Sequence, residues 1–221
     1  MAHLKLKDRE LGSVQGVLFD KDGTLSHSEP RLIELADARL DEAGRRFRSR
    51  GASASELREL SDLLARTYGR CSAGVIPDGT LAVASRHHNL LSTATVFCQM
   101  NLSWPQSLVL AQEVFDHVDQ HKQALHPGGY PIGLLPDAAR LLRELAAAGI
   151  TCAVISNDTT EGIENFLHQH QLNDCISGLW SADHHPAKPD PGAVQGLCSQ
   201  LDLRVENCAL IGDADTDLLM A

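Results

Sequence analysis

The sequence predicts an α/β fold in which a doubly wound parallel sheet is interrupted by an all-helical insertion. Three observations lead to this prediction. Short apolar runs that end in polar residues occur near the beginning and in the last third of the chain, as expected for buried parallel strands. Helical patterns separate the later runs from one another. Residues 27–127, between the first two runs, carry helical periodicity only.

Four segments are predicted as strands. Val14 to Asp20 is the first, and Ile150 to Ser156, which is almost wholly apolar, is the second. Ile176 to Ala182 is a weaker candidate, and Cys208 to Asp213 repeats the first pattern. Because parallel strands direct their carboxyl ends to one edge of a sheet, we expect the polar residues that end these runs to gather there.

Three helices are predicted among these strands, each beginning at an acidic residue that suits a helix N-terminus. They span Asp137 to Ala148 with Gly149 as the stop, Asp158 to about Gln171 with Glu161 completing a capping pair, and a segment opened by Asp190-Pro191.

Four consecutive helices are predicted within the insertion. Apolar residues recur at helical spacing in each, and two of the helices begin with a capping box, which is a Ser followed three residues later by Glu or Gln. The helices cover Ile33 to Phe47, Leu57 to Tyr68 after Ser53 and Glu56, Thr80 to Met100, and a segment from Ser103 and Gln106 to about Val118.

Composition excludes several classes of protein. The formal net charge of −10 argues against a nucleic-acid footprint, which needs clustered basic residues. No apolar stretch is long enough for a membrane span and no secretory signal is legible, so we expect a cytoplasmic protein without membrane or nucleic-acid partners. Six cysteines lie without CxxC spacing, which favours buried thiols, above all at Cys98, Cys152, Cys175 and Cys208.

The segment after the first predicted strand is the first candidate site. It reads Phe19-Asp20-Lys21-Asp22-Gly23-Thr24-Leu25. Two carboxylates two residues apart, followed by a glycine that lets the backbone approach a ligand, could hold a hard cation and leave one oxygen free to react. The alternative is an ordinary Asp-rich turn, in which Asp-Gly dipeptides are common.

Further motifs follow in a fixed order along the chain. They are Ser156-Asn157 after the second strand, Lys188 before a helix, and the run from Gly212-Asp213 to Asp217 after the last strand. With the Asp20 segment, this set resembles the four motifs of the haloacid dehalogenase superfamily, and the chain resembles its phosphoglycolate-phosphatase-like members with an inserted helical cap. The resemblance implies a Rossmann-like core domain of residues 1–26 and 128–221 and a helical cap domain of residues 27–127.

The resemblance also implies a role for each motif residue. Asp20 would be the nucleophile that forms an aspartyl-phosphate, and Asp22 the general acid and base. Mg²⁺ would be held by the Asp20 carboxylate, the Asp22 backbone carbonyl and Asp213. Ser156, Asn157 and Lys188 would bind the transferring phosphoryl group, and Asp217 would support the site through water or by holding Lys188. Asp215 falls at a position that the family pattern leaves free, so we expect either a solvated surface side chain or one that lies behind the residues of the site.

The implied activity is a Mg²⁺-dependent phosphatase of small organic phosphate monoesters, with phosphoglycolate as the first candidate. A phosphomutase of the β-phosphoglucomutase type uses the same two aspartates and stays open, as does a non-catalytic phosphate-binding module. Phosphonate hydrolysis is disfavoured because its Schiff-base lysine would have to be Lys122, at a predicted helix end.

A histidine pair and the end of the chain match the superfamily pattern less directly. His117 and His121 stand four residues apart on a predicted helix, which is a possible metal pair, but no third ligand accompanies them and a polar helix face is favoured. The chain ends four residues after Asp217. The superfamily pattern usually continues further, so we expect exposed apolar surface near this end together with a sheet that still assembles.

Overall fold

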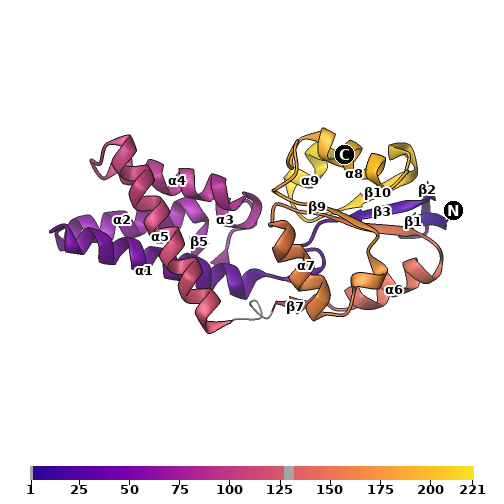
Figure 1. The fold of residues 1–221 in the computed structure, drawn as a ribbon, viewed down its shortest axis with the longest axis horizontal. Coiled ribbons are helices and arrows are strands. Elements are labelled where there is room, and N and C mark those ends of the chain that lie inside the picture. The colour runs from indigo at the N-terminus through magenta and orange to yellow at the C-terminus, as the bar shows by residue number, and fades with distance from the viewer. Residues whose placement is uncertain (1, 127–131) are drawn as a thin grey trace. The chain divides into compact units, whose positions relative to one another are not determined.

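The computed structural model describes residues 2–126 and 132–221. The chain divides into two compact units: Met1–Ser28 together with Pro131–Ala221, and Glu29–Tyr130. The first unit contains a β-sheet flanked by helices, and the second is almost entirely helical (Figure 1). The prediction of an α/β fold with a helical insertion is confirmed.

Four strands form the central sheet of the first unit. They are β3 (Gly16–Phe19), β8 (Thr151–Ile155), β9 (Gly178–Trp180) and β10 (Cys208–Ile211). The spatial order is β10-β3-β8-β9 and every pairing is parallel, so the chain winds outward from β3 in both directions. All four β3 residues are buried, as a central strand covered on both faces requires.

Helices cover both faces of this sheet. Helices α6 (Ala138–Ala147) and α7 (Thr160–Gln169) lie on one face, and α8 (Pro191–Gln200) and α9 (Asp215–Met220) lie on the other (Figure 1). A core cluster joins strand residues such as Leu18 and Ile155 to Leu197 of α8 and Met220 of α9. The doubly wound arrangement is therefore built as the sequence predicts, with the carboxyl ends of the strands at one edge.

Shorter elements complete the first unit. An N-terminal hairpin of β1 (Ala2–Leu6) and β2 (Arg9–Val14) precedes the sheet and was not predicted. Strand β4 (Ser26–His27) pairs with β7 (Gly133–Leu134). Two short 3₁₀ helices, η1 (Asn173–Cys175) and η2 (Val205–Asn207), precede β9 and β10 respectively.

The second unit packs its helices around a separate apolar core. That core includes Phe47, Leu64, Phe97 and Phe115, all buried. The unit consists of α1 (Glu29–Ser49), α2 (Ala54–Tyr68), α3 (Thr80–Val83), α4 (Arg86–Gln99) and α5 (Trp104–Leu125), with a small hairpin of β5 (Arg70–Cys71) and β6 (Gly74–Val75).

Local capping sets most of these helix boundaries. Both predicted capping boxes form: Glu56 accepts a hydrogen bond from the Ser53 backbone at 2.7 Å, and Gln106 accepts one from the Ser103 backbone at 3.1 Å. The single helix predicted over Thr80 to Met100 is wrong. The chain breaks between α3 and α4, where the Ser85 side chain accepts from the His88 backbone and begins a new helix.

Burial of the thiols is uneven. All six cysteines are free, Cys152 and Cys198 are buried and Cys71 is exposed. Cys98, Cys175 and Cys208 are only half-buried, so the expectation of buried thiols is confirmed for Cys152 and Cys198 and is wrong for the other four. The neighbouring sulfurs of Cys198 and Cys208 lie 3.8 Å apart.

Apolar side chains are exposed near the end of the last helix. Leu218 and Leu219 of α9 are 76% and 66% exposed. Strand β10, which precedes α9, lies at one edge of the described sheet and pairs with β3. Throughout residues 2–126 and 132–221, no helix is long and apolar enough to cross a bilayer.

Candidate active site at the carboxyl edge of the sheet

Three strands deliver polar residues to one edge of the sheet. Asp20 follows β3, Ser156 follows β8 and Asp213 follows β10 after Gly212. The backbone hydrogen bonding between β3 and β10 continues into the site, because the Asp20 N–H donates to the Ile211 carbonyl at 2.8 Å. The sheet thereby fixes the positions of these residues before any side chain contact is made.

A buried lysine holds two of the carboxylates. The Lys188 ammonium lies 2.7 Å from Oδ1 of Asp20 and 2.6 Å from Oδ1 of Asp217. All three residues are buried, at 7%, 5% and 3% exposure respectively. Burial opposes the charge on Lys188, but the two carboxylates outweigh it and raise the lysine pKa. The sequence therefore brings together groups from β3, α9 and the loop before α8.

Asp20 has the most perturbed carboxyl group of the site. Burial raises its pKa to about 7, although the attraction of Lys188 acts in the opposite direction. Repulsion from Asp217 and Asp22 adds to the rise. A carboxylate in this position needs further positive charge if it is to stay ionised at neutral pH.

The carboxylates could take that positive charge from a metal ion. Oxygen atoms of Asp20, Asp213 and Asp217 all lie within 4.8 Å of one another, and within the described residues this is the one such group of three His, Cys, Asp or Glu side chains. Carboxylate oxygens are the ligands that Mg²⁺ prefers. Partial burial raises the pKa of Asp213, and Asp217 adds to that rise. The donor set and its unbalanced charge fit a divalent cation.

Two glycines let the acidic residues come this close. A Cβ on Gly23, whose φ is +88°, would lie 2.0 Å from an Asp213 carboxylate oxygen. A Cβ on Gly212 would lie 2.1 Å from the carboxyl carbon of Asp217. No side chain can be accommodated at either position without displacing an acidic group of the site.

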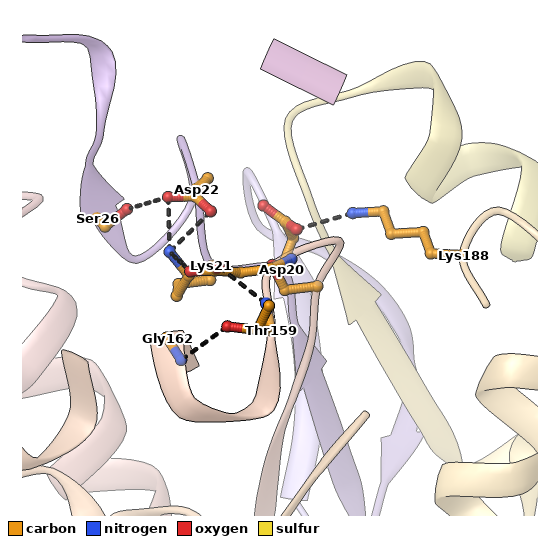
Figure 2. A network of polar contacts seen from close by, with 9 residues as sticks. Asp20, Lys21, Asp22, Ser26, Thr159, Gly162 and Lys188 are labelled. Carbon is orange, nitrogen blue, oxygen red and sulfur yellow. Dashed lines mark hydrogen bonds and ion pairs between the residues drawn. The ribbon is translucent and has the colours of Figure 1, made fainter. Parts of the chain in front are cut away.

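Asp22 makes a different set of contacts from Asp20. Its carboxylate accepts a hydrogen bond from the Lys21 ammonium at 2.7 Å and one from the Ser26 hydroxyl at 3.1 Å (Figure 2). Its side chain is 25% exposed, whereas that of Asp20 is 6% exposed. One carboxylate is therefore enclosed beside Lys188, and the other stays accessible while fixed by two donors.

Sequence reasoning missed Lys21 and misassigned Asp158. The Lys21 side chain is fully buried, and its ammonium lies 3.0 Å from Oδ2 of Asp158. The predicted cap of α7, Asp158, is wrong: Thr159 is the N-cap, and its hydroxyl accepts from the Gly162 backbone at 3.1 Å (Figure 2). The available signal was a lysine placed directly after a buried strand and between two acids.

The remaining predicted residues lie around this centre. The Ser156 hydroxyl is buried and accepts a hydrogen bond from the Asp158 backbone at 3.1 Å. Asn157 follows it and is half-buried. Asp215 is exposed on the first turn of α9, which agrees with the prediction of a solvated side chain.

His117 and His121 lie in the other unit, on α5. The Nε2 atom of His117 is 3.5 Å from the Arg45 guanidinium and 3.6 Å from a carboxylate oxygen of Glu42. His117 thus takes part in a polar helix interface, the reading favoured from the sequence. Lys122 lies on the same helix, and burial lowers its pKa.

The chemistry available at the sheet edge follows from its charges. Five carboxylates share two ammonium groups, with Lys188 between Asp20 and Asp217 and Lys21 between Asp22 and Asp158. The fifth carboxylate, Asp213, has no lysine partner among these contacts. Such a site suits a substrate whose own negative charge is neutralised by a lysine and a divalent cation.

Comparison with known proteins points to one family. The family model for haloacid dehalogenase-like hydrolases matches residues 14–221. A phosphoglycolate phosphatase of Yersinia pestis is 26% identical over 210 residues, covering 95% of this chain and 77% of the relative. A phosphoglycolate phosphatase of Vibrio cholerae is 27% identical over 210 residues, covering 95% of this chain and 80% of the relative.

Solved structures agree on the fold. A protein described as a predicted phosphoglycolate phosphatase from Haemophilus somnus superposes with a TM-score of 0.64 at 18% identity, covering 95% of this chain and 81% of the other. The match of the family model extends from the strand that precedes Asp20 to the end of the run that contains Asp213 and Asp217. The chain belongs to the haloacid dehalogenase-like hydrolase family.

Proposed function

We propose that this hydrolase is a phosphatase that acts on small organic phosphate monoesters, with phosphoglycolate as the first substrate to test. The observation that carries the proposal is the buried Asp20 carboxylate, held 2.7 Å from Lys188 beside two further acidic side chains. The curated relatives that match most of this chain bear the name phosphoglycolate phosphatase, which supports the choice of substrate.

In the first half of the proposed reaction, a carboxylate oxygen of Asp20 attacks the phosphorus atom. A bond forms between that oxygen and phosphorus, and the bond from phosphorus to the ester oxygen breaks. Asp22, which must be protonated when this step begins, gives its proton to the departing oxygen, which leaves as an alcohol. The product on the enzyme is an aspartyl-phosphate, and Asp22 is then ionised and able to act as a base.

In the second half, water attacks the phosphorus of the aspartyl-phosphate. Asp22 takes a proton from that water, and the bond between phosphorus and the Asp20 oxygen breaks. Inorganic phosphate leaves and both carboxyl groups return to their starting protonation states. A single accessible carboxylate, fixed by Lys21 and Ser26, thus serves both proton transfers.

Other residues of the edge would bind the phosphoryl group. Lys188 offsets the repulsion between Asp20 and an approaching phosphate, because its ammonium already lies against the nucleophile. Ser156 and Asn157 would offer a hydroxyl and a backbone N–H at the end of β8. Asp217 holds Lys188 at 2.6 Å and so orients it toward Asp20.

Mg²⁺ is the proposed cofactor. The Asp20 carboxylate, the Asp22 backbone carbonyl and Asp213 would hold it, with Asp217 close enough to contribute directly or through water. When bound, the ion supplies neutralising charge for the phosphoryl oxygens and for the crowded carboxylates. A cytoplasmic location also belongs to this proposal, and cell fractionation tests it.

The first experiment is Mg²⁺-dependent phosphate release from p-nitrophenyl phosphate, phosphoglycolate and a small panel of sugar phosphates and nucleotides. We expect turnover that both EDTA and Asp20→Asn abolish. Release of free phosphate distinguishes hydrolysis from the phosphomutase alternative, in which the phosphoryl group returns to a sugar hydroxyl. A folded wild-type protein that releases no phosphate from any ester with Mg²⁺ present contradicts the proposal and favours a binding module.

A further inference from the structure

Lys21 is the most completely buried charged side chain at the sheet edge, with no exposed side-chain surface. Lysines are almost never fully buried unless an acidic group is paired with them. Here the ammonium lies 2.7 Å from both carboxylate oxygens of Asp22 and 3.0 Å from Oδ2 of Asp158. The lysine therefore contacts both oxygens of Asp22, which fixes the place of the carboxylate, and the Ser26 hydroxyl 3.1 Å from Oδ1 restricts its rotation.

The partners of Lys21 are themselves anchored. Asp158 accepts from the Thr159 backbone at 2.8 Å, and its own backbone donates to the Ser156 hydroxyl at 3.1 Å. On the apolar side, the Lys21 ammonium lies 5.6 Å from the centre of the Phe166 ring of α7. These contacts and the complete burial of the Lys21 side chain restrict where its ammonium can lie.

A close approach of α7 makes this arrangement possible. A Cβ on Gly162 would lie 2.6 Å from both carboxylate oxygens of Asp158. The first turn of the helix can therefore lie directly against Asp158. Thr159 caps the helix instead, and its hydroxyl accepts from the Gly162 backbone (Figure 2). Asp158 is released from the local role that its position in the sequence predicts and serves Lys21 instead.

We infer that Lys21 is a positioning residue for the proton-transferring carboxylate Asp22, an inference that rests on the proposed phosphatase function. Lys21 gives up no proton in the reaction. With Ser26 as the second donor at 3.1 Å, it holds the Asp22 carboxyl group in one orientation while 25% of that side chain stays exposed to an incoming ester. Through Asp158, it also ties Asp22 to the loop after β8, which carries Ser156 and Asn157.

The proton requirement of the leaving group tests whether Lys21 positions Asp22 as the acid. An alkyl phosphate releases an alkoxide, which needs a proton as the bond to phosphorus breaks, whereas p-nitrophenyl phosphate releases a stable phenolate that needs none. The parameter kcat/KM covers the first phosphoryl transfer, in which Asp22 acts as the acid. A misplaced Asp22 must therefore lower kcat/KM for alkyl esters much more than for the aryl ester. A general loss of structure lowers both together.

The test compares kcat/KM for phosphoglycolate, or for the fastest alkyl ester of the panel, with kcat/KM for p-nitrophenyl phosphate. The variants are Lys21→Met, Lys21→Arg and, as the reference for a lost acid, Asp22→Asn. We expect Lys21→Met to lose about 100-fold or more on the alkyl ester and less than about 10-fold on the aryl ester, since general acid catalysis contributes on the order of 10²–10⁴-fold. Asp22→Asn should show the same selectivity, and Lys21→Arg should recover part of the alkyl activity.

A further variant guards against failure of Lys21→Met to fold. Asp158→Asn removes the charge that lies 3.0 Å from Lys21 and leaves Lys21 and Asp22 themselves unchanged, so we expect a smaller loss in the same direction. Circular dichroism melting confirms that each protein is folded before kinetics are compared. Parallel losses on the two esters in Lys21→Met or Asp158→Asn, or no loss in either variant, overturn the inference. A wild-type protein inactive on every ester overturns the proposed function itself, and the inference with it.

Discussion

Substitution of Gly23 by Ala tests whether Asp213 can keep its position only because residue 23 has no side chain. We expect a loss of folding stability and a displacement of the Asp213 carboxylate. The residue adopts φ +88°, and a left-handed conformation costs an alanine about 1–2 kcal/mol. In addition, the new Cβ would lie 2.0 Å from an Asp213 oxygen, whereas real Cβ contacts essentially never fall below 3.0 Å. The carboxylate must therefore retreat by about 1 Å, a misplacement that can lower turnover about 100-fold.

Gly51→Ala provides a matched control. Gly51 has the same φ of +88°, but a Cβ there would meet nothing within 4 Å. We expect this variant to lose about 1–2 kcal/mol of folding stability and to keep its turnover. Gly23→Ala should lose at least as much stability, about 100-fold in kcat/KM, and require more Mg²⁺ for half-maximal activity.

Each unit contains one tryptophan, Trp104 in α5 and Trp180 in β9. In a Trp104→Phe background, fluorescence follows urea unfolding of the sheet unit, and in a Trp180→Phe background it follows unfolding of the helical unit. Phosphate release over a range of Mg²⁺ concentrations completes the comparison. If Gly23→Ala keeps the turnover and Mg²⁺ requirement of the wild type while Gly51→Ala shows the expected loss of stability, the close approach of Gly23 to Asp213 has no functional role.

Two further predictions follow from burial at the sheet and in its core. In EDTA, folded Asp20 binds its proton with a pKa of about 7 against 3.8 in the unfolded chain, so its contribution to stability falls as pH rises from about 4 to about 7. Urea titrations should therefore show the stability of Asp20→Asn rising relative to wild type over that range, by at most about 4 kcal/mol, and a constant difference across it would disprove the assigned cause. For the thiols, burial raises the pKa of Cys152 to about 11 and that of Cys198 to about 12, so iodoacetamide at pH 8 should label exposed Cys71 in the folded protein and these two only after unfolding. Peptide mass spectrometry identifies which cysteines are labelled before and after unfolding, and labelling of Cys152 in the folded protein would contradict its burial.

Local sequence signals predicted the helix starts that depend on neighbouring residues alone. Ser53 with Glu56 and Ser103 with Gln106 form their capping boxes, and Asp190 caps α8 by accepting from the Gly192 backbone at 2.8 Å. Each of these contacts joins residues two or three apart, so the sequence contains all the information that the contact needs.

Asp158 shows where such reasoning stops. Its sequence context suits a helix cap as well as that of Asp190, but a lysine more than one hundred residues earlier in the chain, Lys21, draws its carboxylate away. The neighbouring Thr159 then caps α7. A buried ion pair between distant segments outweighs a local preference whose energy is only about 1 kcal/mol.

The N-terminal hairpin escaped prediction for a different reason. Lys7 and Asp8 form its turn, both with positive φ, at 48° and 64°. A two-residue turn of this kind is usually signalled by Asn-Gly or Asp-Gly, and neither dipeptide is present there. A register shift between Leu4 and Lys5 also disturbs the alternation of side chains that marks a strand.

The position of the inserted helical unit also determines the order in which the chain can fold. Strand β3 pairs with β8 and β10, so residue 16 needs residues 151 and 208 before the central sheet can form. Helices α1 to α5, between Glu29 and Leu125, are contiguous in the sequence, and helical units with local contacts fold faster than sheets of distant strands. During synthesis, Val17, Leu18 and Phe19 therefore have no sheet neighbour while the whole insertion is made. Until β8 and β10 have both been made, these apolar residues lack their partner strands, which is the general hazard of sheets built from distant segments.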